Sequence, residues 1–95
     1  MSATNEKTRR KLDLHQDALE FLRSLQGKQC KQVTLSILAL AEDARPHDSK
    51  LLKGFSYYRI DVGEYRVIYR FDAETVYVVD AGKRNDNEVY RWLKR

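Results

Sequence analysis

Residues 57–80 read YYRIDVGEYRVIYRFDAETVYVVD, and this stretch decides the fold. Polar and apolar residues alternate along it with a period of two, which is typical of strands that bury one face. Gly63 and Glu64 separate the first two alternating runs, and a two-residue loop with glycine first is typical of a type II′ hairpin turn. A second tight turn at residues 72–74 leads into a third run. The stretch therefore predicts a three-stranded antiparallel meander.

The Gly63-Glu64 turn also predicts which residues lie opposite each other in the hairpin. Val62 pairs with Tyr65, and Asp61 pairs with Arg66. In this register the apolar side chains of both strands share one face, which we expect the helices to cover. The apolar face carries Tyr58, Ile60, Val62, Tyr65, Val67, Tyr69 and Phe71, and the opposite face carries Arg59, Asp61, Arg66, Ile68 and Arg70.

Upstream of the meander, the pattern predicts one strand and two helices. Residues 11–15 alternate as a short strand does. Apolar residues at helical spacing follow, with Asp17 as the expected N-cap and Gly27 as the expected stop. A second helix is expected from Lys28 to about Glu42. Residues 46–56 have no clear period and are expected to form a connection.

The chain is expected to end in a short helix, because Asn85 and Glu88 have the spacing of a capping box. Residues 1–8 are polar and lack a period, so we expect a flexible N-terminal tail there and a single domain over residues 9–95. The predicted fold class is α+β. An N-terminal strand and a two-helix hairpin pack on a mainly antiparallel sheet that contains the C-terminal meander.

Composition excludes several classes of protein. The 95 residues include 18 Lys and Arg against 14 Asp and Glu, which gives a net charge of +4. The single cysteine, Cys30, cannot form an internal disulfide, and with no signal peptide in view we expect a cytoplasmic protein. No apolar stretch approaches the roughly 20 residues that span a membrane. The sequence has no glycine-rich phosphate loop and no Cys/His cluster with metal spacing, so we expect neither cofactor nor metal.

The charges of the hairpin suggest a site for an anion. Arginines on adjacent strands repel each other unless an anion lies among them, and Asp61 can pair with only one or two of them. Guanidinium groups match phosphate oxygens, and Gly82-Lys83-Arg84 leads into the expected last helix, whose first N–H groups also favour an anion. These features predict a phosphate-sized site for nucleic acid. A solvated sheet face, with Asp61 and Arg66 as an ordinary cross-strand pair, is the alternative.

The order of elements, together with several short motifs, resembles the RelE toxins of bacterial toxin–antitoxin systems, in the RelE/ParE superfamily. The motifs are Leu52-Lys53-Gly54, Tyr58-Arg59-Ile60, the run from Gly63 to Tyr69, Ala81-Gly82-Lys83-Arg84, and Glu88-Val89-Tyr90. The resemblance implies the RelE/ParE-like microbial RNase fold and a ribosome-dependent endonuclease that cleaves mRNA in the A site. In that reaction a ribose 2′-OH attacks the adjacent phosphate, giving a 2′,3′-cyclic phosphate and a 5′-OH without a metal.

The resemblance also implies a catalytic set. Arg66 matches the arginine that stabilises the transition state, and Arg84 matches the arginine near the leaving group. Tyr90 matches a tyrosine that assists the nucleophile or stacks on the nucleotide, although its spacing also suits the inner stripe of the last helix. Arg59 stands where such toxins often carry lysine, and Asp61 replaces a second basic residue. Because Arg59 stays protonated, the base is Asp61 or Tyr90, or else Asp61 orients Arg66.

Further basic residues are expected to contact RNA or the ribosome, namely Lys50, Lys53, Arg70, Lys83, Arg91, Lys94 and Arg95. The resemblance implies a cognate antitoxin that holds the toxin inactive in a hetero-oligomer, with the ribosome and mRNA as further partners. Two other functions stay open. One is a ParE-like inhibitor of DNA gyrase, and the other is a non-catalytic module that binds RNA or the ribosome.

Overall fold

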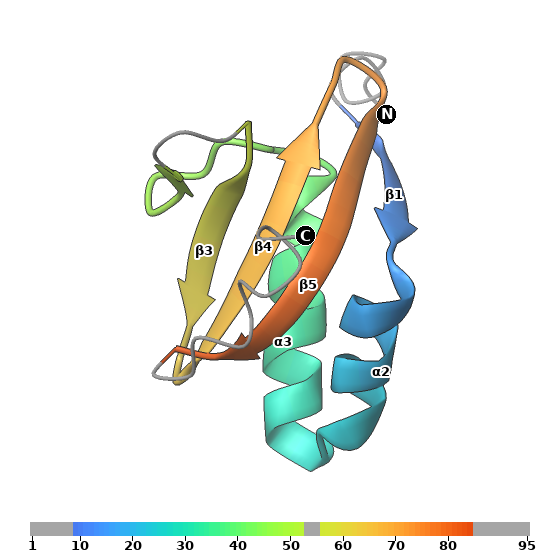
Figure 1. The fold of residues 1–95 in the computed structure, drawn as a ribbon, viewed down its shortest axis with the longest axis vertical. Coiled ribbons are helices and arrows are strands. Elements are labelled where there is room, and N and C mark those ends of the chain that lie inside the picture. The colour runs from blue at the N-terminus through green and yellow to red at the C-terminus, as the bar shows by residue number, and fades with distance from the viewer. Residues whose placement is uncertain (1–8, 53–55, 85–95) are drawn as a thin grey trace, which may run out of the picture.

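The computed structural model describes residues 9–52 and 56–84, and in it two helices cover one face of a five-stranded sheet (Figure 1). In chain order the elements are β1 (Lys11–Leu14), α2 (Gln16–Ser24), α3 (Gly27–Leu40), β2 (Lys50–Leu51), β3 (Tyr58–Val62), β4 (Tyr65–Phe71) and β5 (Thr75–Lys83). They confirm the predicted α+β class, with the strand, the helix pair and the meander in the predicted order. The expected tail at residues 1–8 and the expected C-terminal helix lie outside the described residues.

The strands lie in the order β1-β5-β4-β3-β2, so the N-terminal strand pairs with the last strand of the meander. This β1–β5 pair is parallel, and the other pairs are antiparallel, as in the mainly antiparallel sheet that was predicted. The hairpin register agrees with the prediction, with Asp61 opposite Arg66 and Val62 opposite Tyr65. The segment expected to be a connection contains β2, which pairs Lys50 with Arg59.

The apolar stripes of the helices pack on the apolar face of the sheet. Val33, Ile37 and Leu40 recur at helical spacing along α3 and are at most 2% exposed. The buried strand residues that share this core are Ile60, Val62, Tyr65, Val67, Tyr69, Val76, Val78 and Ala81. The Tyr69 hydroxyl donates to the Ala44 carbonyl at 2.7 Å, which ties the segment after α3 to the sheet. Burial raises the pKa of Tyr69 to about 12.

Two helix boundaries differ from the prediction. Asp17 is not the N-cap of α2, because His15 caps the helix by accepting the Asp17 N–H on Nδ1 at 3.1 Å. Gly27 is not the stop, since it is the first residue of α3 and has a φ of +53°. The backbone is already extended at Leu25, and α2 therefore ends at Ser24. Neither described helix has the length and apolar character needed to cross a membrane.

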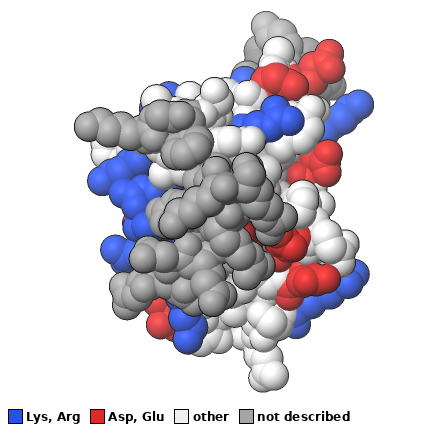
Figure 2. All heavy atoms as spheres, in the orientation of Figure 1, with Lys and Arg blue, Asp and Glu red and all other residues white. Residues whose placement is uncertain are grey.

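The face of the sheet away from the helices carries the charged side chains of the hairpin. Figure 2 shows this face, with Lys and Arg side chains gathered on the side where β3 lies. The face also includes two buried residues, Ile68 and Asp80, which lie opposite each other in the β4–β5 register. This face is therefore not simply a solvated sheet face, because Ile68 and Asp80 are buried on it among the charged side chains.

Candidate functional site

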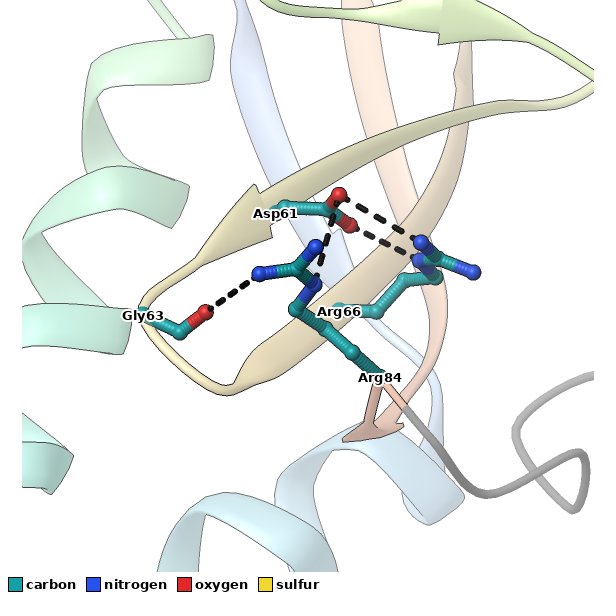
Figure 3. A network of polar contacts seen from close by, with 4 residues as sticks. All are labelled: Asp61, Gly63, Arg66 and Arg84. Atoms are coloured by element: carbon teal, nitrogen blue, oxygen red, sulfur yellow. Dashed lines mark hydrogen bonds and ion pairs between the residues drawn. The ribbon is translucent and has the colours of Figure 1, made fainter.

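Three of the predicted site residues meet beside the β3–β4 turn (Figure 3). Asp61 lies on β3, Arg66 lies opposite it on β4, and Arg84 directly follows β5. The Arg84 backbone N–H donates to the Glu64 carbonyl at 2.9 Å, which holds the end of β5 against the hairpin turn. Residues that are far apart in the sequence thus form one cluster.

A β-bulge in β5 brings Arg84 to this face of the sheet. Ile68 pairs with Asp80 but its neighbour Tyr69 pairs with Val78, so Val79 is an extra residue in the strand. Side chains before the bulge, such as Val78, face the core at even positions. After the bulge, even-numbered residues lie on the opposite face, as the pairing of Gly82 with Arg66 shows. Arg84 therefore shares the face of Arg66.

The Asp61 carboxylate bridges the two arginines, and together the three side chains form what we call the arginine clamp. Arg66 donates from Nε to Oδ1 at 2.8 Å and from Nη2 to Oδ2 at 3.3 Å. Arg84 Nε lies 3.6 Å from Oδ2 of the same carboxylate. The Arg66 side chain is 14% exposed and that of Arg84 is 48% exposed. The clamp therefore has one enclosed guanidinium and one that solvent reaches.

The hairpin turn contributes its backbone to the site. Arg84 Nη1 donates to the Gly63 carbonyl at 3.3 Å. Gly63 has a φ of +60°, a conformation that the first position of a type II′ turn requires and that glycine adopts readily. The turn that sets the register of the hairpin thereby also holds the Arg84 guanidinium. Sequence reasoning missed this backbone contact, although the Gly-first turn was the signal that could have indicated it.

The electrostatics of the clamp leave it positively charged. The hydrogen bond from Arg66 lowers the pKa of Asp61, burial opposes this, and the charges of Arg66, Arg59 and Arg84 lower it further. Asp61 is therefore ionised at neutral pH. Three guanidinium charges against one carboxylate give this corner of the sheet a net charge of +2. Such a surface can bind a phosphate group by charge-assisted hydrogen bonds.

The other predicted residues are spread around the clamp. Arg59 acts on Asp61 through its charge, and it lies opposite Lys50 on the β2 side. Arg70 lies away from the clamp, with its guanidinium 4.0 Å from the centre of the Tyr77 ring. Lys83 pairs with Tyr65, a residue of the helix-covered face, so the register separates it from Arg66. The remaining predicted residues, Lys53, Tyr90, Arg91, Lys94 and Arg95, lie outside the described residues.

One acidic residue on this face was missed. Asp80 is 3% exposed, and its Oδ1 accepts the Ala81 N–H at 2.8 Å. The sequence around Asp80 gives no sign that this residue is buried on the charged face. Its position depends on the β-bulge, which the alternation of polar and apolar residues does not reveal. Across residues 9–52 and 56–84, no three His, Cys, Asp or Glu side chains gather as metal ligands do.

Toxins and toxin–antitoxin complexes are among the solved structures with a similar fold. A variant of the Escherichia coli toxin RelE in the free state has 28% identity and a TM-score of 0.73, over 87% of this chain and 92% of that chain. The intact E. coli RelBE toxin–antitoxin complex gives 28% identity and a TM-score of 0.67, over 78% and 95%. The toxin–antitoxin complex RelBE2 from Mycobacterium tuberculosis, at 20% identity and a TM-score of 0.71 over 83% and 95%, is similar in fold.

Sequence comparison agrees with this likeness. No curated protein sequence matches the chain. A family model described as the ParE toxin of the type II toxin–antitoxin system parDE matches residues 6–88, which include both helices and the whole described sheet. The chain therefore belongs to the ParE toxin family of type II toxin–antitoxin systems, within the RelE/ParE superfamily.

Proposed function

We propose that this toxin is a ribosome-dependent endoribonuclease that cleaves mRNA in the ribosomal A site. The observation that carries the proposal is the arginine clamp, with Arg66 and Arg84 held side by side on one carboxylate next to Arg59. The attack of a 2′-OH on the adjacent phosphate adds negative charge to the phosphate oxygens. Guanidinium groups that are held in place before the reaction stabilise such charge without further rearrangement.

Each residue then has a role that suits its position. The enclosed Arg66 stabilises the developing charge on the phosphate, and the more exposed Arg84 stabilises the leaving 5′-oxygen. Arg59 adds positive charge on the β3 side, where Lys50 extends the surface toward the RNA. Tyr90 assists the nucleophile or stacks on a base. Removing one preorganised donor of this kind typically costs about 100-fold to 1,000-fold in rate.

The proposal includes a cognate antitoxin in the cytoplasm. The E. coli and M. tuberculosis relatives were solved in complex with antitoxins. By analogy, we expect a small co-encoded protein to bind this toxin in a hetero-oligomer and to block access to the clamp. Purification of the tagged toxin from its native host should recover that protein, and recovery of the toxin alone would contradict this part of the proposal.

A second candidate function is inhibition of DNA gyrase, and the description of the matching family model favours it. The clamp favours the nuclease, because two arginines held on one carboxylate, with a third arginine beside them, give a positive corner that suits a phosphate whose charge grows during cleavage. A non-catalytic module that binds ribosomal RNA is the third possibility, and it would use the same positive surface.

One experiment separates these functions. The purified toxin is incubated with ribosomes programmed with a defined mRNA and, in parallel, with gyrase and supercoiled DNA. Cleavage of the mRNA at a codon position is the expected result, and Arg84→Ala should reduce it by about 100-fold or more. Arg23→Ala, which removes an exposed arginine in the last turn of α2, is the control and should keep most of the activity. Gyrase-dependent DNA breaks, or ribosome binding without cleavage, would refute the proposal.

A further inference from the structure

We infer that Asp61 is a positioning residue that fixes the guanidinium groups of Arg66 and Arg84 as one unit, and that it does not take the proton from the 2′-OH. The inference rests on the proposed function for its catalytic meaning. Its structural part, the fixing of two arginines by one carboxylate, stands on the contacts of the clamp alone.

The geometry of the Asp61–Arg66 pair fixes the Arg66 guanidinium. Both carboxylate oxygens accept from the same guanidinium, Oδ1 from Nε and Oδ2 from Nη2. Two parallel hydrogen bonds fix the plane of a guanidinium as well as its distance. The two residues are also direct partners in the β3–β4 register, so the sheet itself sets the separation of their backbones. Arg66 is therefore held in one orientation.

Arg84 lies just beyond the end of β5, so strand pairing alone does not fix its side chain. It follows β5, and its side chain is held by the Gly63 carbonyl at 3.3 Å and by Asp61 Oδ2 at 3.6 Å. Without the carboxylate, the two guanidinium groups would lose the partner that they share, and their like charges would repel each other. Asp61 is therefore the link that allows the two arginines to lie side by side.

The contacts of the Asp61 carboxylate suit a positioning residue better than a residue that takes a proton from the substrate. Oδ1 is occupied by Arg66, and Oδ2 lies between Arg66 and Arg84, so both oxygens already face cationic groups. The hydrogen bond from Arg66 also lowers the pKa of Asp61, which makes its carboxylate a weaker base than an isolated one. A base must accept a proton from the substrate in the transition state, whereas Asp61 is arranged to accept hydrogen bonds from the protein.

The inference predicts how substitutions combine. Asp61→Asn keeps the size of the side chain but removes the charge and one acceptor, and we expect it to slow mRNA cleavage by about 100-fold, as for a misplaced catalytic group. Asp61→Glu should recover part of the rate. In an Arg66→Ala background, Asp61→Asn should cost no more than about threefold further, because a residue that acts through another loses its effect when that residue is absent. A residue that acts independently of Arg66 would keep its full effect there.

A second readout does not depend on catalysis. In the free, ¹⁵N-labelled toxin, the Nε–H resonance of Arg66 should be protected from exchange with solvent. Asp61→Asn, which removes the charge and one acceptor, should weaken this protection, and Asp61→Glu should retain more of it. Asp13→Asn, which changes an exposed acid at the other edge of the sheet, is the matched control and should leave it unchanged.

The two readouts distinguish the possible failures. Unchanged Arg66 Nε–H exchange in Asp61→Asn would overturn the inference, whatever the activity. A full additional loss of rate from Asp61→Asn in the Arg66→Ala background would overturn it, because Asp61 would then act independently of Arg66. If the wild-type toxin cleaves no mRNA but Asp61→Asn weakens the protection of the Arg66 Nε–H from exchange with solvent, the proposed function fails and the positioning of the arginines is supported.

Discussion

Replacement of Asp61 by asparagine should destabilise the fold at neutral pH. Asp61 accepts two hydrogen bonds from the Arg66 guanidinium, and hydrogen bonds to charged groups are worth about 1.5–3 kcal/mol each when they are well buried. The Asp61 side chain is 34% exposed, so solvent screens part of this energy. Asparagine can keep one acceptor. We therefore expect the free energy of unfolding to fall by about 1–2 kcal/mol.

This loss should depend on pH in one direction. The hydrogen bond from Arg66 lowers the pKa of Asp61 from its ordinary value of 3.8 in the folded protein, so the folded state binds this proton less readily than the unfolded state. The stabilisation is complete above that ordinary value and is lost as the pH falls through the lower pKa of the folded state. The difference in unfolding free energy between wild type and Asp61→Asn should therefore be constant near pH 7 and shrink below about pH 4.

Urea denaturation of both proteins, followed by circular dichroism at several values of pH between 7 and 3, measures this difference. Asp13→Asn serves as the control, because Asp13 is an exposed acid on β1, and it should show little change at any pH. An Asp61→Asn deficit that stays the same from pH 7 to pH 3, or no deficit at pH 7, would show that the ionised carboxylate does not hold the clamp together.

Three further predictions test other parts of the structure. Tyr69→Phe removes the 2.7 Å hydrogen bond to the buried Ala44 carbonyl, so the free energy of unfolding should fall by about 1–1.5 kcal/mol. Urea denaturation measures this change, and an unchanged value would argue against the bond. Gly63→Val forces a β-branched residue into a φ of +60° and should lower the melting temperature, whereas Gly63→Asn should lower it much less; equal effects would contradict the type II′ turn. Arg84→Ala should reduce mRNA cleavage by about 100-fold or more while the melting temperature stays close to that of the control Arg23→Ala. A parallel loss of stability would indicate a structural role for Arg84 instead.

The register of the hairpin could be predicted from the sequence because local signals agreed there. A two-residue loop with glycine first allows one pairing that keeps the apolar side chains of both strands, except Ile68, on one face, and a slip by one residue would move them to the other face. The pairing of Asp61 with Arg66 followed directly from that register. The fold order followed because the helical and strand periods are distinct along the chain.

The third member of the clamp could not be predicted from alternation. Val76 and Val78 are buried in the core, and an unbroken alternation would have sent Arg84 toward the core as well. The bulge at Val79 changes which face of the sheet the following even-numbered residues share, and valine at that position does not indicate a bulge. The contact of Arg84 with Asp61 depends on this bulge together with the backbone bond from Arg84 to Glu64.

The short β2 and the helix boundaries were missed for a different reason. A two-residue strand has no period of its own, and its existence depends on the neighbouring edge of β3. Similarly, His15 replaces Asp17 as the N-cap because the extended backbone at His15 brings its ring nitrogen to the Asp17 N–H. Both features depend on tertiary or backbone geometry rather than on residue preference.

The role of the arginine clamp in RNA cleavage can be tested by the chemistry of the RNA ends that the purified toxin makes on an mRNA, with and without ribosomes. If the arginine clamp supports attack by the 2′-OH, the upstream fragment should carry a 2′,3′-cyclic phosphate and the downstream fragment a 5′-OH, and both should form only when ribosomes are present. The absence of cleavage, or fragments with a 3′-OH and a 5′-phosphate, would contradict the account.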